Sequence, residues 1–216
     1  MDRKFEAVRI TNELSIKKYT YSENDSWFWA DASMVYMAVR SCPSCIKYAT
    51  DEIKHNLDVC LRVLKLNQSF QHLPEAMKTH PSIILKYIKN GKYYEGELKI
   101  PDELISNHSF LLKMIDSNVW ADQFIPDFYQ RTDLMIYHLK KYPNRIFNSS
   151  MAQNNYDLIL EAVKLDGTLI RFASDELKNN RILCLEAVKN NSKAFDYIPR
   201  YYWYDDDFYK LYQNFI

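Results

Sequence analysis

Apolar residues at positions 158–163 recur at the three- and four-residue spacing of an amphipathic helix. The stretch 158–164 returns 25 residues later as 183–189, with Cys184 in place of Ile159 as the one difference. Recurrence at a fixed period is the sequence signature of a repeat protein, in which each unit buries its apolar face against the next. The pattern therefore predicts a stack of similar helical repeats.

The repeat keeps its register along most of the chain. We define the marker position as that of Ala162 and align the other repeats to it. The marker residues, spaced 24 to 27 residues apart, are Ala38, Val63, Tyr87, Met114, His138, Ala162 and Ala187. No segment rich in Pro, Gly or Ser interrupts this register, which favours one continuous array.

Each repeat carries two signals for a helix start. Seven residues before the marker stand Asp31, Asn56, His80, Asn107, Arg131 (followed by Thr132), Asn155 and Asn180, which are mostly N-cap residues. About 12 residues after it stand Thr50, Pro74, Pro101, Pro126, Ser149, Ser174 and Pro199, which suit a second start. We expect two helices of roughly 8 to 10 residues per repeat, too short to be stable without stacking.

The expected fold is all-α, an α-solenoid of about seven to eight short helix pairs with a period of about 25 residues. We expect residues 1–216 to form a single helical-repeat domain. Within it, residues 1–30 are a degenerate N-terminal cap, residues 31–204 are the repeat units, and residues 205–216 are a C-terminal capping helix.

Composition excludes several classes of function. Lys plus Arg and Asp plus Glu number 28 each, so no net charge attracts nucleic acid. The three glycines are too scattered to form a phosphate-binding loop, and we expect no cofactor. The N-terminus lacks a Sec signal and no apolar run spans a membrane, which predicts a soluble cytoplasmic protein, or a host-cell cytosolic one if it is exported without that signal.

The pattern read from Asp157 to Asn180, with Ala-Val-Lys at its centre and Ala-Ser-x-Glu-Leu-Lys after it, resembles the repeat of domain-of-unknown-function family 4116. The resemblance is clear at residues 31–56 and 157–198. Repeats of this family occur in amoeba-associated bacteria, giant viruses and protists, often in proteins suspected of acting in a host cell. The resemblance implies a setting of host interaction, and it carries over no functional residues.

Cys42 and Cys45 form the sharpest local motif, because two cysteines at this spacing can be a redox pair or half of a zinc site. Cys60 and His55 are the nearby residues that could complete such a site. The repeat alignment instead places Cys45 in a core position and Cys42 in the turn between two helices. We therefore expect no metal site, and a redox role for the pair stays open.

Two histidines lie in the divergent middle of the array, residues 81–155. His138 takes the marker position and should be buried on an apolar face, whereas His108 lies beside a helix cap. Neither has an evident nucleophile and carboxylate around it. We expect no catalytic residues, although an enzyme site hidden in this region remains the alternative function.

Aromatic residues make up 15% of the chain and gather in two runs. The runs are Trp27, Phe28 and Trp29, and Tyr201, Tyr202, Trp203 and Tyr204. They can seal the ends of the array, but four consecutive residues of a helix cannot all face inward. These seven residues are the predicted partner-binding set, because Tyr and Trp anchor interfaces.

The leading hypothesis is a non-enzymatic scaffold for protein–protein interaction, effector-like and acting in a host cell. Its partner is a protein of unknown identity. The second hypothesis is the enzyme in residues 81–155. The third is a helical repeat that binds nucleic acid, which requires a basic stripe along one face.

Overall fold

The computed structural model describes residues 3–15, 21–66, 70–91, 98–143, 145 and 149–214. The described residues form helices and turns and contain no strand, which confirms the all-α prediction. The chain divides into an N-terminal block, Met1–Phe124, and a C-terminal block, Ile125–Ile216. That residues 1–216 form a single domain stays a prediction.

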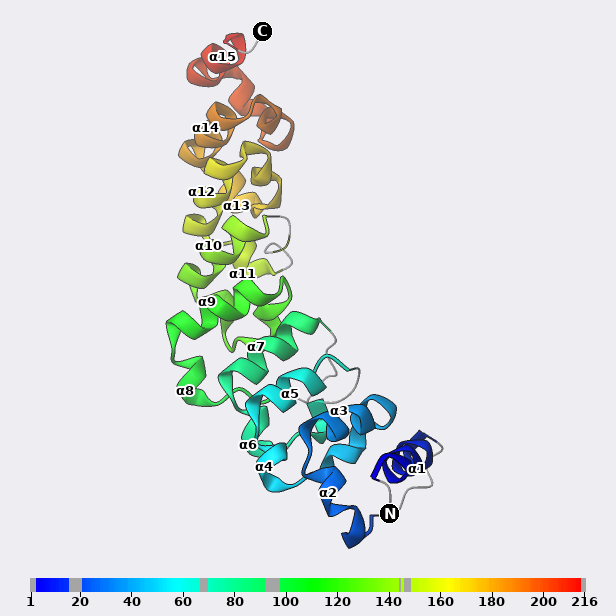
Figure 1. The fold of residues 1–216 in the computed structure, drawn as a ribbon. Coiled ribbons are helices and arrows are strands. Elements are labelled where there is room, and N and C mark those ends of the chain that lie inside the picture. The colour runs from blue at the N-terminus through cyan, green and yellow to red at the C-terminus, as the bar shows by residue number, and fades with distance from the viewer. Residues whose placement is uncertain are drawn as a thin grey trace. The chain divides into compact units, whose positions relative to one another are not determined.

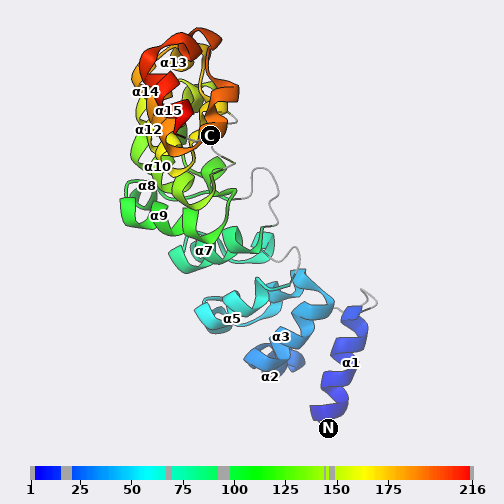
Figure 2. The same ribbon diagram turned by 90° about the horizontal axis from the view of Figure 1, so that it is seen from above.

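The elements follow one another as short α-helices and 3-10 helices (Figures 1 and 2). Those of the N-terminal block are α1 (Arg3–Ser15), η1 (Glu23–Asp25), α2 (Ser26–Trp29), α3 (Ala32–Ser41), η2 (Pro43–Tyr48), α4 (Asp51–Lys54), α5 (Leu57–Val63), η3 (Phe70–His72), α6 (Glu75–Lys78), α7 (Pro81–Asn90), α8 (Asp102–Ile105), α9 (His108–Ser117) and η4 (Ala121–Phe124). Those of the C-terminal block are η5 (Phe128–Gln130), α10 (Thr132–Lys141), α11 (Ser150–Gln153), α12 (Tyr156–Leu165), η7 (Gly167–Phe172), α13 (Asp175–Lys178), α14 (Arg181–Asn190), η8 (Ser192–Tyr197), η9 (Arg200–Tyr204) and α15 (Asp206–Gln213).

The first helix of each repeat forms as the sequence predicts. Every marker residue is buried, and the helices that carry them pack on one another in chain order: α3, α5, α7 and α9 in one block, and α10, α12 and α14 in the other (Figure 1). The predicted cap side chains accept a backbone N–H of the first turn at six of the seven starts. Arg131 is the exception, because a guanidinium has no acceptor atom.

The predicted length of the second helix is wrong. At its start signal the chain makes a single α-helical turn, as in α4, α6 and α13, preceded by a 3-10 segment such as η2 or η7. The physical reason is spacing. Only five residues lie between the second start, for example Ser174, and the next cap at Asn180. That distance leaves room for one turn.

Hydrogen bonds one period apart join neighbouring repeats. The Asn190 amide accepts from Gly167 N at 2.8 Å and donates to the Lys164 carbonyl at 2.9 Å. Asn90 donates in the same way to the Leu64 carbonyl at 2.7 Å. These bonds satisfy backbone groups at helix ends that have no partner within their own helix.

A close approach between repeats occurs at Gly167, the first residue of η7. A Cβ built on Gly167 would lie 2.0 Å from the Ala187 carbonyl oxygen and 3.0 Å from Asn191 N, both of them backbone atoms. A backbone cannot move aside as a flexible side chain can. Gly167 therefore sets how closely η7 packs on α14.

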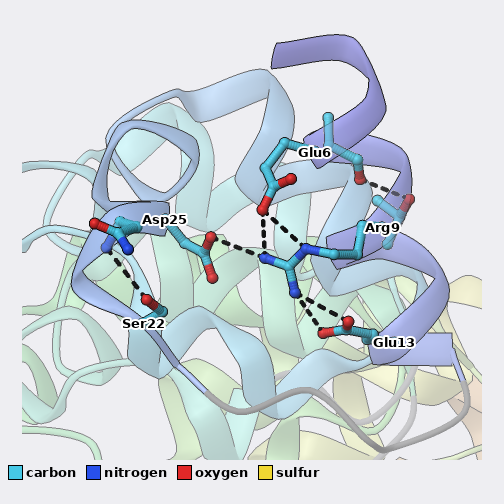
Figure 3. A network of polar contacts seen from close by, with 8 residues as sticks. Glu6, Arg9, Glu13, Ser22 and Asp25 are labelled. Carbon is cyan, nitrogen blue, oxygen red and sulfur yellow. Dashed lines mark hydrogen bonds and ion pairs between the residues drawn. The ribbon is translucent and has the colours of Figure 1, made fainter. Parts of the chain in front are cut away.

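Helix α1 is attached to the array by both apolar and polar contacts. Its buried Ile10 and Leu14 join the core that includes α3. The Arg9 guanidinium donates to Glu6 at 2.8 Å, to Glu13 at 2.9 Å and to Asp25 of η1 at 3.0 Å (Figure 3). Of the N-terminal cap expected over 1–30, residues 1, 2 and 16–20 lie outside the described part.

We expect Gly167→Ala to lower the free energy of unfolding by about 1–3 kcal/mol, the usual cost of overpacking. Ser192 holds the same position in the next repeat and already has a Cβ. Ser192→Ala is therefore the matched control, with an expected change within about 0.5 kcal/mol. Urea unfolding of both variants checks the prediction, and equal midpoints would contradict the close approach at Gly167.

We expect Arg9→Ala to destabilise the N-terminal block by about 1–3 kcal/mol, because the Asp25 carboxylate, 1% exposed, loses this charged donor. Glu13→Gln removes the charge of one partly buried partner of Arg9 and should cost only a few tenths of a kcal/mol. Denaturant unfolding compares the two variants. An equal effect would show that the buried Asp25 does not depend on Arg9.

Candidate partner-binding groove

An open groove of about 660 Å³ lies between η8, η9 and α15 in the C-terminal block. Its lining residues come from these three elements and from the link between η8 and η9, and they are mostly aromatic. They are Phe195, Asp196, Ile198, Arg200, Trp203, Tyr204, Phe208, Tyr209 and Tyr212. Asp196 and Arg200 carry opposite charges, so the lining has no formal net charge.

The apolar floor of the groove belongs to the core. Phe195, Ile198 and Phe208 are buried. The Phe208 ring stacks on Tyr202 with centroids 4.8 Å apart, and Phe195 meets Phe208 and Tyr212 edge to face at 6.3 and 5.5 Å. Aromatic pairs in these arrangements gain energy beyond simple burial. The floor is therefore a rigid, packed surface.

The walls expose large aromatic faces. Tyr204 is 90% exposed, and Trp203, Tyr209 and Tyr212 are each about half exposed. Tyr212 stands in the marker position of the next repeat, one period after Ala187. All earlier marker residues are buried, whereas Tyr212 keeps 47% of its surface accessible. The groove thus lies on the repeat seam, the line of marker positions along which successive repeats pack.

A charged clamp positions α15 beside α14 (Figure 1). The Arg181 guanidinium donates to both carboxylate oxygens of Asp205, at 3.0 and 2.9 Å, and to Asp207 at 2.6 Å. Asp205 also caps α15 by accepting the Asp207 backbone N–H at 3.0 Å. The hydrogen bonds from Arg181 hold the pKa of the Asp205 carboxyl below its usual range and raise the pKa of the guanidinium.

The sequence profile of a family described as "Domain of unknown function (DUF4116)" matches residues 31–78 and 155–203. Both regions are therefore similar to the repeat of this family. The match confirms the resemblance drawn from the sequence, and its second region extends into the groove as far as Trp203. No curated protein and no solved structure matches the chain.

The seven aromatic residues predicted to bind a partner divide into core and surface. Phe28, Trp29 and Tyr202 are buried, so they form core and offer no contact surface. Trp27 is half-buried, with Arg3 over its ring at 5.4 Å, and Tyr201 is exposed and donates to the Asn179 side chain at 2.8 Å. Trp203 and Tyr204 are the two that line the groove.

Sequence reasoning missed the contribution of α15 to the groove. Tyr209 and Tyr212 stand three residues apart on this helix and line the same groove. Aligning Asp205 with Asn180 would have identified α15 as the first helix of a further repeat. In that alignment, the tyrosines close to Phe208 are the sequence signal that indicates the groove.

The cysteines and His55 of the N-terminal block do not gather into a metal site. Cys60 donates to the Lys54 carbonyl at 3.1 Å, and His55 Nδ1 contacts the Asp51 carbonyl at 2.8 Å. Across the described residues no three His, Cys, Asp or Glu side chains converge on a point that could hold a metal ion. Nor is any of the described helices long and apolar enough to cross a bilayer.

The two histidines of the middle region differ in their exposure to solvent. His138 is buried, with the rings of Phe128 and Tyr142 at 5.7 and 5.1 Å from its own. His108 is exposed at the first position of α9. The surroundings of His138 are therefore those of a core residue, as the marker position predicts.

A run of cations follows the marker two residues later in most repeats. The residues are Arg40, Lys65, Lys89, Lys140, Lys164 and Lys189, and Asp116 is the exception at this position. Cations near a helix C-terminus are stabilised by the helix dipole. The Glu161 carboxylate pairs with both Lys140 and Lys164, at 3.4 and 2.9 Å. The charge on this part of the face is mixed, unlike the basic stripe that a nucleic-acid site requires.

We expect the α14–α15 clamp to weaken in acid. Because its pKa is lowered in the folded protein, Asp205 contributes stability that is present above the ordinary aspartate pKa of about 3.9 and is lost as the pH falls through the lower folded value. The indole N–H resonance of Trp203, followed by NMR down to low pH, reports the change. Asp205→Asn should remove this dependence, whereas Asp206→Asn, with the same charge loss at the same turn, should keep it; identical titrations would contradict the clamp.

Proposed function

We propose that this chain is a non-enzymatic protein-binding module whose contact site is the groove between η8, η9 and α15. One observation carries the proposal: Trp203, Tyr204, Tyr209 and Tyr212 expose aromatic surface around a single groove with a packed apolar floor. Exposed apolar surface concentrated in one place marks an interaction site. Tyr and Trp are also the residues that most often dominate binding energy.

The repeat itself suggests the chemistry of the occupant. In the preceding repeat, the 3-10 segment η7 packs on α12, α14 and η8 and buries the adjacent residues Leu169 and Ile170. The groove on α15 is the equivalent surface one repeat later. The charges of its two charged lining residues, Asp196 and Arg200, cancel. We therefore propose that it accepts a short, uncharged segment of a partner protein with two adjacent apolar residues. Tyrosine hydroxyls and the Trp203 indole N–H supply hydrogen bonds for that segment's backbone.

The setting follows from the family resemblance. DUF4116 repeats are associated with proteins suspected of acting in host cells, and the proposal places this chain among effector-like proteins that bind a host protein in the cytosol. Because the groove lies on the repeat seam, the binding function depends on the same packing that holds the array together.

Selection of displayed random peptides against the folded chain tests the groove directly. We expect enriched peptides to share an adjacent apolar pair and to lose at least about tenfold in affinity for a variant carrying both Trp203→Ala and Tyr204→Ala, as expected when hot-spot residues are truncated. Affinities are measured by fluorescence anisotropy, and circular dichroism checks that the variant is folded.

Tyr197→Ala is the matched control, because Tyr197 is an exposed tyrosine of η8 that does not line the groove. This variant should bind the selected peptides as the wild type does. Equal binding by the groove variant, or no enrichment over scrambled sequences, would overturn the proposal.

A further inference from the structure

A short turn at residues 42–45 occurs again in later repeats. In the later repeats its first residue is Asp or Asn, and here it is a cysteine. Cys42 aligns with Asp166 and Asn191, and all three lie between the first helix and the following 3-10 segment. In the later repeats the side-chain oxygen accepts a backbone N–H two residues on, from Thr168 at 3.0 Å and from Lys193 at 3.1 Å. The position is thus built to hold a hydrogen-bond acceptor.

Cys42 holds the same capping position, but its sulfur contacts the Ser44 hydroxyl instead of a backbone N–H. Cys42 has the same extended backbone, with φ −145° against −153° at Asp166, and its Sγ lies 3.3 Å from the Ser44 hydroxyl. Burial alone would raise the pKa of the Cys42 thiol, but hydrogen bonds from Cys45 and Ser44 outweigh it and leave the pKa below the ordinary value. A thiolate accepts hydrogen bonds better than a thiol, so the site favours the reactive form.

Cys45 lies three residues after Cys42, in the same turn. Its backbone N–H donates to the Cys42 carbonyl at 3.0 Å and closes a tight turn. Such turns hold their end Cα atoms within about 7 Å, close to the 4.4–6.8 Å range usual for disulfides. Cys45 is buried, and burial together with the neighbouring Cys42 raises its thiol pKa. One sulfur is therefore half-exposed and activated, and the second is shielded beside it.

We propose that Cys42 and Cys45 form a redox-active dithiol that exchanges with a small disulfide of the glutathione class. The Cys42 thiolate attacks one sulfur of glutathione disulfide, the S–S bond breaks, and one glutathione leaves as a thiolate. Cys45 then gives up its proton to solvent and attacks the Cys42 sulfur, which releases the second glutathione. Two protein thiols are oxidised to one disulfide, and one glutathione disulfide is reduced to two thiols.

The other two cysteines provide an internal contrast. Cys60 and Cys184 share one repeat position, three residues before the marker, and each donates its thiol to a lysine carbonyl, at 3.1 Å to Lys54 and at 3.0 Å to Lys178. Both are buried, and burial raises their thiol pKa values to about 11 and 12. Neither should react with small disulfides while the chain is folded.

The test incubates the full chain in buffers of graded glutathione to glutathione-disulfide ratio near neutral pH, followed by alkylation and peptide mass spectrometry. We expect loss of two thiols as a Cys42–Cys45 disulfide that dithiothreitol reverses, while Cys60 and Cys184 stay reduced. Cys45→Ser should accumulate the mixed disulfide of Cys42 with glutathione. Cys60→Ser should behave as the wild type does.

Cys42→Asp is the variant that removes the attacking thiol, and Asp166 shows that aspartate is compatible with the capping position. This variant should remain folded and form neither species. Alkylation of Cys42 by iodoacetamide no faster than that of Cys60, or a mixed disulfide that persists in the wild type without conversion to the Cys42–Cys45 bond, would overturn the proposal.

Discussion

The packing of each first helix on the next is the interaction on which the rest of the structure depends. These helices are ten residues or fewer in most repeats, and helices of that length are marginal in water on their own. Burial of the marker residues supplies the stability that propensity cannot. Small residues at Ala162 and Ala187, together with Gly167, let successive helices approach closely enough for Asn190 to bond with both neighbouring backbone groups. Each repeat is therefore stable only as part of the stack.

The groove is a consequence of this constraint. Helix α15 docks on α14 as a further first helix, with Asp205 in the cap position and Phe208 buried in the core. Its marker residue, Tyr212, contacts Phe195 on one side and remains accessible on the other. The surface beside Tyr212 is therefore aromatic. Because Phe208 and Arg181 fix α15, the groove has a defined shape.

The sequence predicted the parts of the structure that repeat and missed the parts that depend on local geometry. Period, caps and the burial of Ala38 or His138 follow from alignment, since one solution serves every repeat. The length of the helix between Ser174 and Asn180 does not follow from the alignment. Start signals mark where a helix begins, and they do not tell how the chain fills the five residues between them. In the aromatic run at 27–29, Phe28 and Trp29 are core because a single α-turn directs them inward, and Trp27 is half-buried. Groove residues from α15 were not predicted, because residues 205–216 were expected to cap the array and were not aligned as a further repeat.

A fixed scaffold leaves function to the positions where one repeat departs from the others. Cys42 stands where an Asp or Asn oxygen caps the following segment, so a thiol in contact with the Ser44 hydroxyl takes the place of that oxygen. Tyr212 stands at the marker position, where every earlier residue is buried, and instead faces a groove. His138, by contrast, differs from the other marker residues in its side chain but is buried as they are. Aromatic rings lie next to it. The informative departures are those in which a side chain gains exposure or reactivity that the repeat position does not normally permit.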